Sequence, residues 1–163
     1  MSRQTVSLLA AVLVLAAGAC NEDSTTPSEP TSFAATLTGA AERPNAVTTT
    51  ATGSATVTID EAASSMAFTV NVTGITNVIA AHIHVGRSDV AGPIVVNLLS
   101  AAPPAGVING SLSTGTITQA SIATGVPITF GSLVALMRKG DLYVNVHTQA
   151  NAAGEIRGQL TPQ

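Results

Sequence analysis

All three histidines of this chain lie in two short segments that alternate as a β-strand does. One segment is Ala81-His82-Ile83-His84-Val85, and the other is Tyr143-Val144-Asn145-Val146-His147. Because a strand turns successive side chains to opposite faces, His82 and His84 share a face that the aliphatic residues of their segment avoid. His147 lies on the polar side of its own segment in the same way. If the aliphatic residues face a core, all three imidazoles point away from it.

Three imidazoles placed in this way are suited to bind one metal ion. A His-x-His pair on a strand face holds its Cα atoms about 6.5–7 Å apart, so both rings can reach one ion at about 2 Å. A third imidazole from a neighbouring strand completes the set, and imidazole is a ligand of both copper and zinc. The spacing therefore predicts a copper or zinc site at His82, His84 and His147. Binding requires neutral rings, so the affinity should fade as the pH falls through the ordinary imidazole pKa of about 6.5.

Histidines on a polar sheet face also have a structural use. Their rings hydrogen-bond backbone and hydroxyl groups, and Asn97, Asn145 and Thr148 are available as partners in this sequence. One distance separates the two interpretations. Ring nitrogens of all three residues within about 4–5 Å of one another would favour a metal site, since ligands converge on one ion. Rings on separate surfaces would eliminate it.

Strands and turns account for most of the chain around these histidines. Apolar and polar residues alternate over 55–60 and 66–73, with a hairpin at 60–65, and further strands are expected over 78–85, 93–99, 143–147 and 155–160. Asn109-Gly110 favours a tight hairpin turn. Ser132–Lys139 is the one expected helix, ended by Gly140. Seven or eight short strands without long helices predict an antiparallel β-sandwich of Greek-key type.

The composition limits the classes of function. Hydrophobic residues make up 45% of the chain and aromatic residues only 2%, so the core must be largely aliphatic. The net charge of -3 and the lack of a basic patch exclude a nucleic-acid-binding surface. A single cysteine rules out an internal disulfide. No serine lies in a Gly-x-Ser-x-Gly elbow and no glycine-rich loop has nucleotide-binding spacing, so the sequence contains no complete catalytic constellation.

The amino terminus has the pattern of a bacterial lipoprotein. Arg3 and an apolar run over 6–17 lead to Ala17-Gly18-Ala19, and Cys20 follows directly. This junction resembles the lipobox, in which the cysteine is lipidated; an ordinary secretory signal with an incidental cysteine is the alternative. We expect a signal peptide over 1–19, a lipidated cysteine with a disordered polar linker over 20–32, and a folded domain over 33–163. The protein would then be exported and anchored to a membrane of the cell envelope, facing the periplasm or the exterior.

Several segments resemble a known domain family. They are His-Ile-His-Val-Gly at 82–86, Gly-Pro-Ile-Val-Val-Asn-Leu at 92–98, Tyr-Val-Asn-Val-His-Thr at 143–148 and Gly-Glu-Ile-Arg-Gly-Gln-Leu at 154–160. With an opening Leu-x-Gly-x-x-Glu-x-Pro pattern at 37–44, they are similar to the CHRD domain, named after chordin, over 33–160. The resemblance implies that Gly154, Glu155, Arg157 and Gly158 belong to the family signature. We interpret Glu155 and Arg157 as a structural pair, with Arg157 fixing the loop at 151–154 through its carbonyl groups.

The histidine segments are also similar to part of the copper site of copper/zinc superoxide dismutase, another β-sandwich with a His-Val-His strand. That resemblance implies that His82, His84 and His147 are counterparts of copper ligands. The present sequence has no fourth histidine to bridge two metals and no pair of cysteines for a disulfide. A dismutase is therefore not expected.

Two functions follow from these patterns. The first is a membrane-anchored CHRD-type interaction module without catalytic activity, which binds an envelope or extracellular protein or polymer. The second is an envelope metal-binding protein that uses the three histidines, with copper before zinc. Neither function involves nucleic acid.

Overall fold

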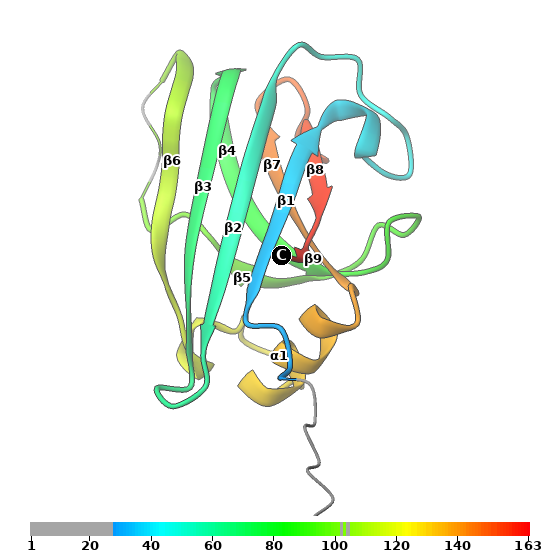
Figure 1. Cartoon of the computed structure of the whole chain (residues 1–163). Helices are drawn as coiled ribbons and strands as arrows, with labels where there is room; N and C mark the ends of the chain where they lie inside the picture. Colours follow the sequence, from blue (N-terminus) through cyan, green and yellow to red (C-terminus); the bar gives the residue numbers. More distant parts are fainter. Residues whose placement is uncertain (1–27, 102, 104) are drawn as a thin grey trace, which may run out of the picture.

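Nine antiparallel strands form one sheet that curls until it is nearly closed, which gives two packed layers (Figure 1). The computed structural model describes residues 28–101, 103 and 105–163, so the expected signal peptide and Cys20 lie outside the described residues. The strands are β1 (Ser32–Thr38), β2 (Thr52–Asp60), β3 (Ser65–Thr76), β4 (Val78–Val85), β5 (Ile94–Asn97), β6 (Val107–Ile117), β7 (Leu142–Thr148), β8 (Ile156–Gln159) and β9 (Thr161–Pro162). Two short 3-10 turns, η1 (Gly39–Ala41) and η2 (Gln119–Ser121), and one helix, α1 (Phe130–Arg138), complete the described elements. No helix in this part of the chain has the length and hydropathy needed to cross a bilayer.

The order of strands in the sheet is β5-β4-β7-β8-β1-β2-β3-β6, and β9 pairs with β1. In Figure 1 β1, β2, β3 and β6 form the near layer, β4, β5, β7 and β8 form the far layer, and α1 closes one end. The run β8-β1-β2-β3 places a strand from the end of the chain beside the first strand. The predicted antiparallel β-sandwich is confirmed. The described part of the chain has nine strands instead of the expected seven or eight. The additional strand is β9, which has only two residues.

An aliphatic core fills the space between the two layers. Along β2, the side chains of Ala55, Val57 and Ile59 are buried while the residues between them are exposed. Ile83 and Val144 are buried in the same core from the far layer, each with at most 1% of its surface exposed. Removing this apolar surface from water is the main driving force for folding. The core therefore holds β4 and β7, the two strands that carry the histidines.

The helix α1 begins two residues earlier than the sequence predicted. It starts at Phe130 rather than Ser132, because Thr129 is its N-cap and the Thr129 hydroxyl accepts a hydrogen bond from the Ser132 amide at 3.1 Å. The helix ends just before Gly140, as expected. The φ angle of Gly140 is 73°, the left-handed conformation in which helices commonly terminate.

The Asn109-Gly110 pair does not form the hairpin turn that the sequence predicted. Both residues lie inside β6. The register between β3 and β6 shifts at this point, and Oδ1 of Asn109 accepts a hydrogen bond from the Gly74 amide at 2.8 Å. Gly74 and Gly110 have φ angles of 67° and 107°, which supply the left-handed backbone of a β-bulge. A pair that tolerates positive φ is thus used here to bend a strand rather than to reverse the chain.

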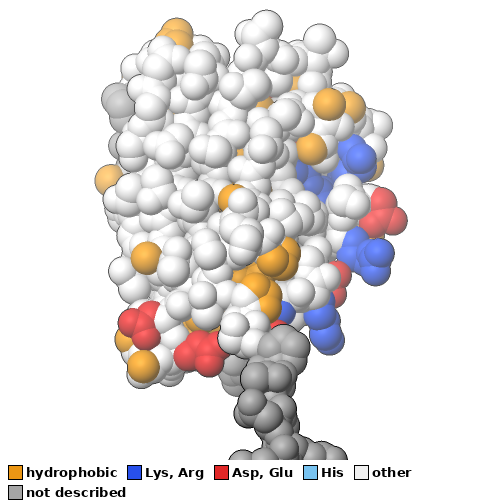
Figure 2. Space-filling model, in the orientation of Figure 1, with side chains coloured by type: hydrophobic (Ala, Val, Ile, Leu, Met, Phe, Trp, Pro, Cys, Tyr) orange, Lys and Arg blue, Asp and Glu red, His pale blue; other side chains and the backbone are white. Residues whose placement is uncertain are grey.

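The outer face of the near layer carries neutral polar side chains in rows. Strand pairing aligns Thr36 with Ser54, Ser54 with Asn71, and Asn71 with Ser111. The next row consists of Thr56, Thr69 and Thr114. Figure 2, in the same orientation as Figure 1, shows few charged or hydrophobic side chains over these strands. This face is exposed to solvent, carries few charges and is rich in hydroxyl groups.

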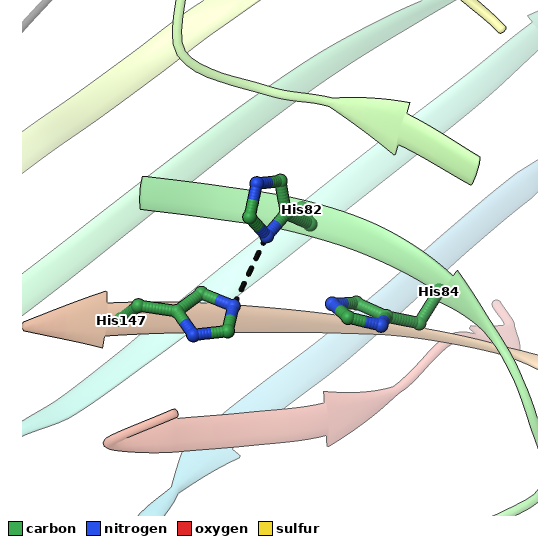
Figure 3. A group of neighbouring side chains, drawn as sticks. All are labelled: His82, His84 and His147. Atoms are coloured by element: carbon green, nitrogen blue, oxygen red, sulfur yellow. Dashed lines mark hydrogen bonds between the residues drawn. The ribbon is translucent and has the colours of Figure 1, made fainter. Parts of the chain in front are cut away.

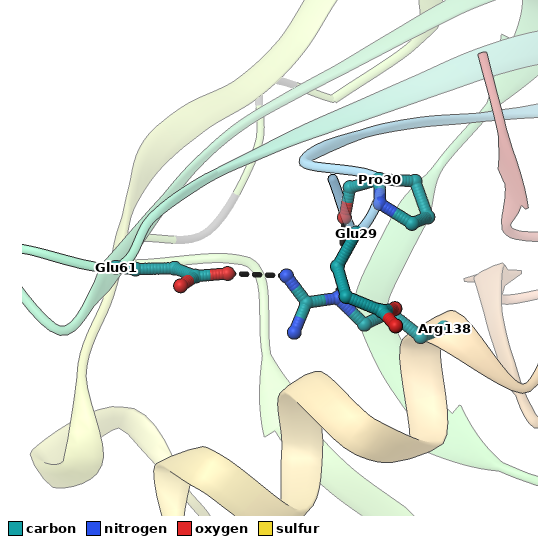
Figure 4. Close-up of polar contacts among 4 residues, drawn as sticks. All are labelled: Glu29, Pro30, Glu61 and Arg138. Atoms are coloured by element: carbon teal, nitrogen blue, oxygen red, sulfur yellow. Dashed lines mark hydrogen bonds and ion pairs between the residues drawn. The ribbon is translucent and has the colours of Figure 1, made fainter. Parts of the chain in front are cut away.

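Arg138 joins the start of the described chain to the helix and to the hairpin between β2 and β3 (Figure 4). Its side chain pairs with Glu29 at 3.6 Å and with Glu61, and it donates a hydrogen bond to the Pro30 carbonyl at 3.3 Å. Both glutamates are mostly exposed, at 68% and 60%, so each ion pair alone contributes little to stability. Together the contacts define where the chain enters the domain.

Candidate metal centre

β4 and β7 lie side by side in the far layer and place the three histidines on their outer face. The antiparallel register pairs His82 with Asn145 and His84 with Tyr143. The same register pairs His147 with Ala80, two residues before His82, so His147 lies diagonally beside this group. Figure 3 shows the three rings turned toward one another across the strand pair. The predicted shared face is therefore confirmed.

The ring nitrogens of the three histidines converge. Nδ1 of His82 lies 3.0 Å from Nε2 of His147, and one ligand nitrogen from each ring lies within 4.8 Å of the other two. Nitrogens bound at about 2 Å to one ion stand about 3.4 Å apart, so the widest separation would shrink by up to roughly 1.4 Å on binding. The separation predicted to favour a metal site, within about 4–5 Å, is met.

Backbone carbonyl groups fix the orientation of two of the rings. Nδ1 of His84 lies 2.9 Å from the Gly92 carbonyl oxygen, and Nδ1 of His147 lies 3.0 Å from that of Ala152. A carbonyl oxygen only accepts hydrogen bonds, so each Nδ1 carries the proton and each Nε2 carries a lone pair. The lone pair of His84 Nε2 is free, whereas that of His147 Nε2 accepts the hydrogen bond from Nδ1 of His82. Metal-binding histidines almost always have such an outer hydrogen bond, which directs the other nitrogen at the ion.

The structure agrees only in part with the alternative interpretation, in which the rings make structural hydrogen bonds and bind no metal. Two rings bond backbone carbonyls, as it requires. However, no hydroxyl group of the described residues bonds a ring nitrogen; the Thr148 hydroxyl instead donates to Glu155. Oδ1 of Asn97 is also used elsewhere, because it accepts a hydrogen bond from the Leu99 amide. The Nε2 atom of His84 is buried and has no partner among the described residues.

Glu155 fixes the loop that supplies the Ala152 carbonyl. Its carboxylate accepts hydrogen bonds from the side chains of Thr148 at 2.6 Å, Thr49 at 2.8 Å and Asn151 at 3.2 Å. Burial acts to raise the pKa of Glu155, but these hydrogen bonds outweigh it and lower the pKa below its ordinary value. The charged carboxylate thus holds both ends of the turn beside His147.

Arg157 is 2% exposed and serves a different loop from the one predicted. Its guanidinium donates a hydrogen bond at 2.7 Å to the carbonyl of Arg87, in the loop between β4 and β5. No salt bridge joins it to Glu155 within the described ranges. Both residues have structural contacts, but the predicted pairing between them and the predicted contact of Arg157 with the loop at 151–154 are wrong. The alternation of side chains along the strand indicated that Glu155 and Arg157 share a face. It could not indicate which loop each residue contacts.

Tyr143 supports His84 from the side. The two rings stack with centroids 4.8 Å apart and planes at 10°. The guanidinium carbon of Arg157 lies 3.4 Å from the centre of the tyrosine ring, and at these distances it must occupy the opposite face. The tyrosine hydroxyl accepts a hydrogen bond from the Gly92 amide at 3.0 Å. The same loop residue therefore orients both His84 and its stacking partner.

Glu42 is a site residue that the sequence analysis did not single out. It is 3% exposed, and its two carboxylate oxygens lie 3.0 and 3.2 Å from Nδ2 of Asn145, which donates to them. Burial raises the pKa of Glu42 to about 7. The only signal in the sequence was its place in the opening Leu-x-Gly-x-x-Glu-x-Pro pattern.

The two signature glycines are explained by close approaches. Gly154 has a φ of 133°, and a Cβ atom there would lie 2.7 Å from both carboxylate oxygens of Glu42. Gly158, on β8, packs against the backbone of β1 at Thr36 and leaves no space for a Cβ atom. A larger residue at either place would displace the elements around the histidines.

Burial lowers the pKa of all three histidines. For His82 the pKa falls to about 4, and the charges that His147 and His84 would carry add to the lowering. The pKa values of His84 and His147 are lowered as well, in each case mainly by burial. The rings therefore stay neutral, and able to bind a metal, to a lower pH than the ordinary imidazole value of about 6.5 predicts.

His82 is the ring closest to solvent. His84 and His147 are only 7% and 8% exposed, whereas His82 is half-buried and lines a cavity of about 360 Å³ together with Asn97 and Ser100. The cluster is thus approached from the His82 side.

We expect the metal-free protein to lose stability as the pH falls from 6.5 to about 4. In this window the unfolded chain binds protons on imidazoles that stay neutral in the folded state, so protonation favours unfolding. Above this window the imidazoles are neutral in both states and contribute no slope. Glu42 acts in the opposite sense between 4.5 and about 7, because its folded form binds the proton more tightly. The single carboxyl group of Glu42 therefore offsets only part of the destabilisation caused by the three histidines.

Urea unfolding at pH values between about 7 and about 4.5 measures this dependence. His82→Gln should reduce the slope of unfolding free energy against pH, by an amount equivalent to at most one bound proton. Glu42→Gln should increase that slope, because it removes the contribution that opposes the histidines. A wild-type protein of constant stability across this range would contradict the assignment of neutral, buried histidines.

Comparison with known proteins gives one family. The model of the CHRD domain matches residues 33–160, a range that includes the three histidines, Glu42 and the four signature residues. No curated protein and no solved structure matched the chain. The resemblance of the histidine segments to superoxide dismutase stays a prediction. Since the matched range covers most of the sequence and carries the whole candidate site, the chain belongs to the CHRD domain family.

Proposed function

We propose that the domain binds one transition-metal ion through His82, His84 and His147. The observation that carries this proposal is the pair of outer hydrogen bonds, at 2.9 and 3.0 Å, from Nδ1 of His84 and Nδ1 of His147 to backbone carbonyls. They direct the Nε2 lone pair of each ring at the cluster, where that of His147 meets Nδ1 of His82 at 3.0 Å (Figure 3), a contact that an ion would replace. This is the arrangement that holds imidazole ligands ready for an ion.

Copper is the preferred metal, ahead of zinc. The candidate ligands are three neutral imidazoles, without thiolate or carboxylate, and such donors suit both ions. Divalent copper binds a given nitrogen site more tightly than the other divalent ions of its series. The rings are already in place before binding, since packing and hydrogen bonds hold two of them. Little ordering is therefore needed when the ion enters.

The lone tyrosine provides a direct test of metal binding. The chain has one tyrosine and no tryptophan, so its ultraviolet fluorescence reports on Tyr143, which stacks on His84 at 4.8 Å. One equivalent of copper(II) should quench this fluorescence, and zinc(II), with its filled d shell, should bind without comparable quenching. Titration of the full chain, purified without a polyhistidine tag, measures both.

Matched variants separate the site from adventitious binding. His84→Gln and His147→Gln should weaken copper binding by at least about 10-fold. Asn97→Ala is the control, because Asn97 lies beside His82 and bonds none of the rings. Copper affinity that is unchanged by His147→Gln would refute a three-histidine site.

We further propose that the protein is exported and held at a membrane of the cell envelope by lipid on Cys20. The support is the apolar run, the small residues before the cysteine and the polar segment after it. Lipid chains on one residue give stable attachment while the domain stays in the aqueous phase.

In a bacterial host, the full chain should incorporate labelled fatty acid and remain with the membrane fraction. Cys20→Ser should abolish both. Incorporation of label that persists in Cys20→Ser, or wild-type protein recovered wholly in the soluble fraction, would exclude the anchor.

A second function, a non-catalytic interaction module, is favoured by the outer face of the near layer. Its rows of neutral hydroxyl and amide groups (Figure 2) can exchange hydrogen bonds with a polymer or protein surface. Family membership also supports a binding role. The two functions are compatible, because the histidines lie on the other layer.

Binding of the protein to isolated envelope material tests this second function. Thr56→Glu places a charge in the middle of the neutral face and should weaken such binding, whereas Ala62→Glu places the same charge in the exposed hairpin after β2 and should not. Equal effects of the two substitutions would show that this face does not make the contact.

A further inference from the structure

Two buried polar atoms at the histidine cluster lack hydrogen-bond partners among the described residues. They are Nε2 of His84 and Oδ1 of Asn145. Asn145 is 3% exposed, and His84 is 7% exposed. A buried polar atom without a partner costs about 1–3 kcal/mol, so such atoms are rare in folded proteins and call for an explanation.

Glu42 determines which end of the Asn145 side chain faces the histidines. Its carboxylate accepts hydrogen bonds, at 3.0 and 3.2 Å, from the Nδ2 end of the amide. Because the amide is planar, the oxygen Oδ1 then points away from Glu42. Gly154 closes this contact from the other side, since a Cβ atom there would strike the carboxylate. The amide is thus held with its oxygen in a defined direction.

Strand pairing places that oxygen at the cluster. Asn145 lies directly opposite His82 in the register of β4 and β7, on the same face as His147 two residues later. The Asn145 side chain is also near enough to His84 to act on its pKa, in the direction opposite to burial. In the metal-free protein, two buried atoms that only accept hydrogen bonds, Nε2 of His84 and Oδ1 of Asn145, therefore lie on one face of this strand pair without a donor.

We propose that Oδ1 of Asn145 is the fourth ligand of the ion held by His82, His84 and His147, with Glu42 as the residue that positions it. This inference rests on the proposed metal-binding function and deepens it. A cation satisfies both unpartnered atoms at once, because each offers a lone pair to it. Three nitrogens and one oxygen also give the four-coordinate set that zinc adopts and that copper accepts.

The opposite neighbour of His82 offers a matched comparison. Asn97 on β5 pairs with His82 across β4 just as Asn145 does from β7. Asn97 is exposed, however, and its Oδ1 atom already accepts a hydrogen bond from the Leu99 amide. The two asparagines therefore share residue type and cross-strand partner, but only Asn145 has a buried oxygen without a donor.

The test compares copper(II) and zinc(II) affinities and the copper electron paramagnetic resonance spectrum across variants of the full chain. Asn145→Ala should weaken both ions by at least about 10-fold and change the copper spectrum, because a water replaces the amide oxygen. Asn97→Ala should leave affinity and spectrum unchanged. The exchange variant Glu42→Gln/Asn145→Asp keeps one amide and one carboxylate in contact and offers a charged oxygen to the ion. It should bind both metals at least as tightly as wild type, which keeps the test valid if Asn145→Ala does not fold.

Three results would overturn the inference while leaving the histidine site in place. They are a folded Asn145→Ala variant with wild-type affinity and spectrum, an exchange variant that loses metal binding although it folds, and a wild-type spectrum showing exchangeable protons of a water ligand at the fourth position. Failure of the wild-type protein to bind copper at all would instead refute the proposed function itself.

Discussion

Strand β7 has no solvated face, and the rest of the domain depends on this constraint. All seven of its residues are buried. One face supplies Val144 and Val146 to the aliphatic core, so it needs only apolar neighbours. The other face carries Asn145 and His147, whose polar atoms lose their water when they are covered and must find partners within the protein.

Three segments of the chain supply partners to this face of β7 and to the adjoining face of β4. The loop after β4 supplies the Gly92 carbonyl to His84, the loop after β7 supplies the Ala152 carbonyl to His147, and the segment after β1 supplies the Glu42 carboxylate to Asn145. Each partner uses a different part of the chain, so the polar face is assembled from regions distant in sequence. Glu155 and Arg157 then hold two of these loops. Of the family signature, Gly154, Glu155 and Arg157 thus make contacts with the segments around this polar face.

Burial shifts the pKa values of the titratable groups on the polar face of β4 and β7. Burial lowers the pKa of the histidines and raises that of Glu42 to about 7. The buried groups are therefore held close to neutrality, with the cation of Arg157 placed against the face of Tyr143. Lone pairs remain at the histidine cluster in a site of low polarity, where their interaction with a cation is stronger than in water. The near layer is organised differently, since its outer face stays in water and presents uncharged hydroxyl groups. The two layers thus give one small domain two chemically distinct surfaces.

The sequence by itself determined which side chains share a face. The alternation around His82 and His84, and around Asn145 and His147, separated the polar positions from the core positions before any fold was known. It also predicted the antiparallel sandwich and the position of the helix to within two residues. These features are local, because the period of a strand and the capping of a helix depend on neighbouring residues.

Tertiary structure alone decided the distances and the partners. His82 reaches His147 at 3.0 Å across 65 residues, and Glu42 reaches Asn145 across 103 residues. The register of β4 on β7 sets the first contact, and the closure of a loop sets the second. The bulge at Asn109-Gly110 and the loops held by Glu155 and Arg157 were misjudged for the same reason. Register and loop closure are set by packing over the whole core, so the local pattern of residues does not encode them.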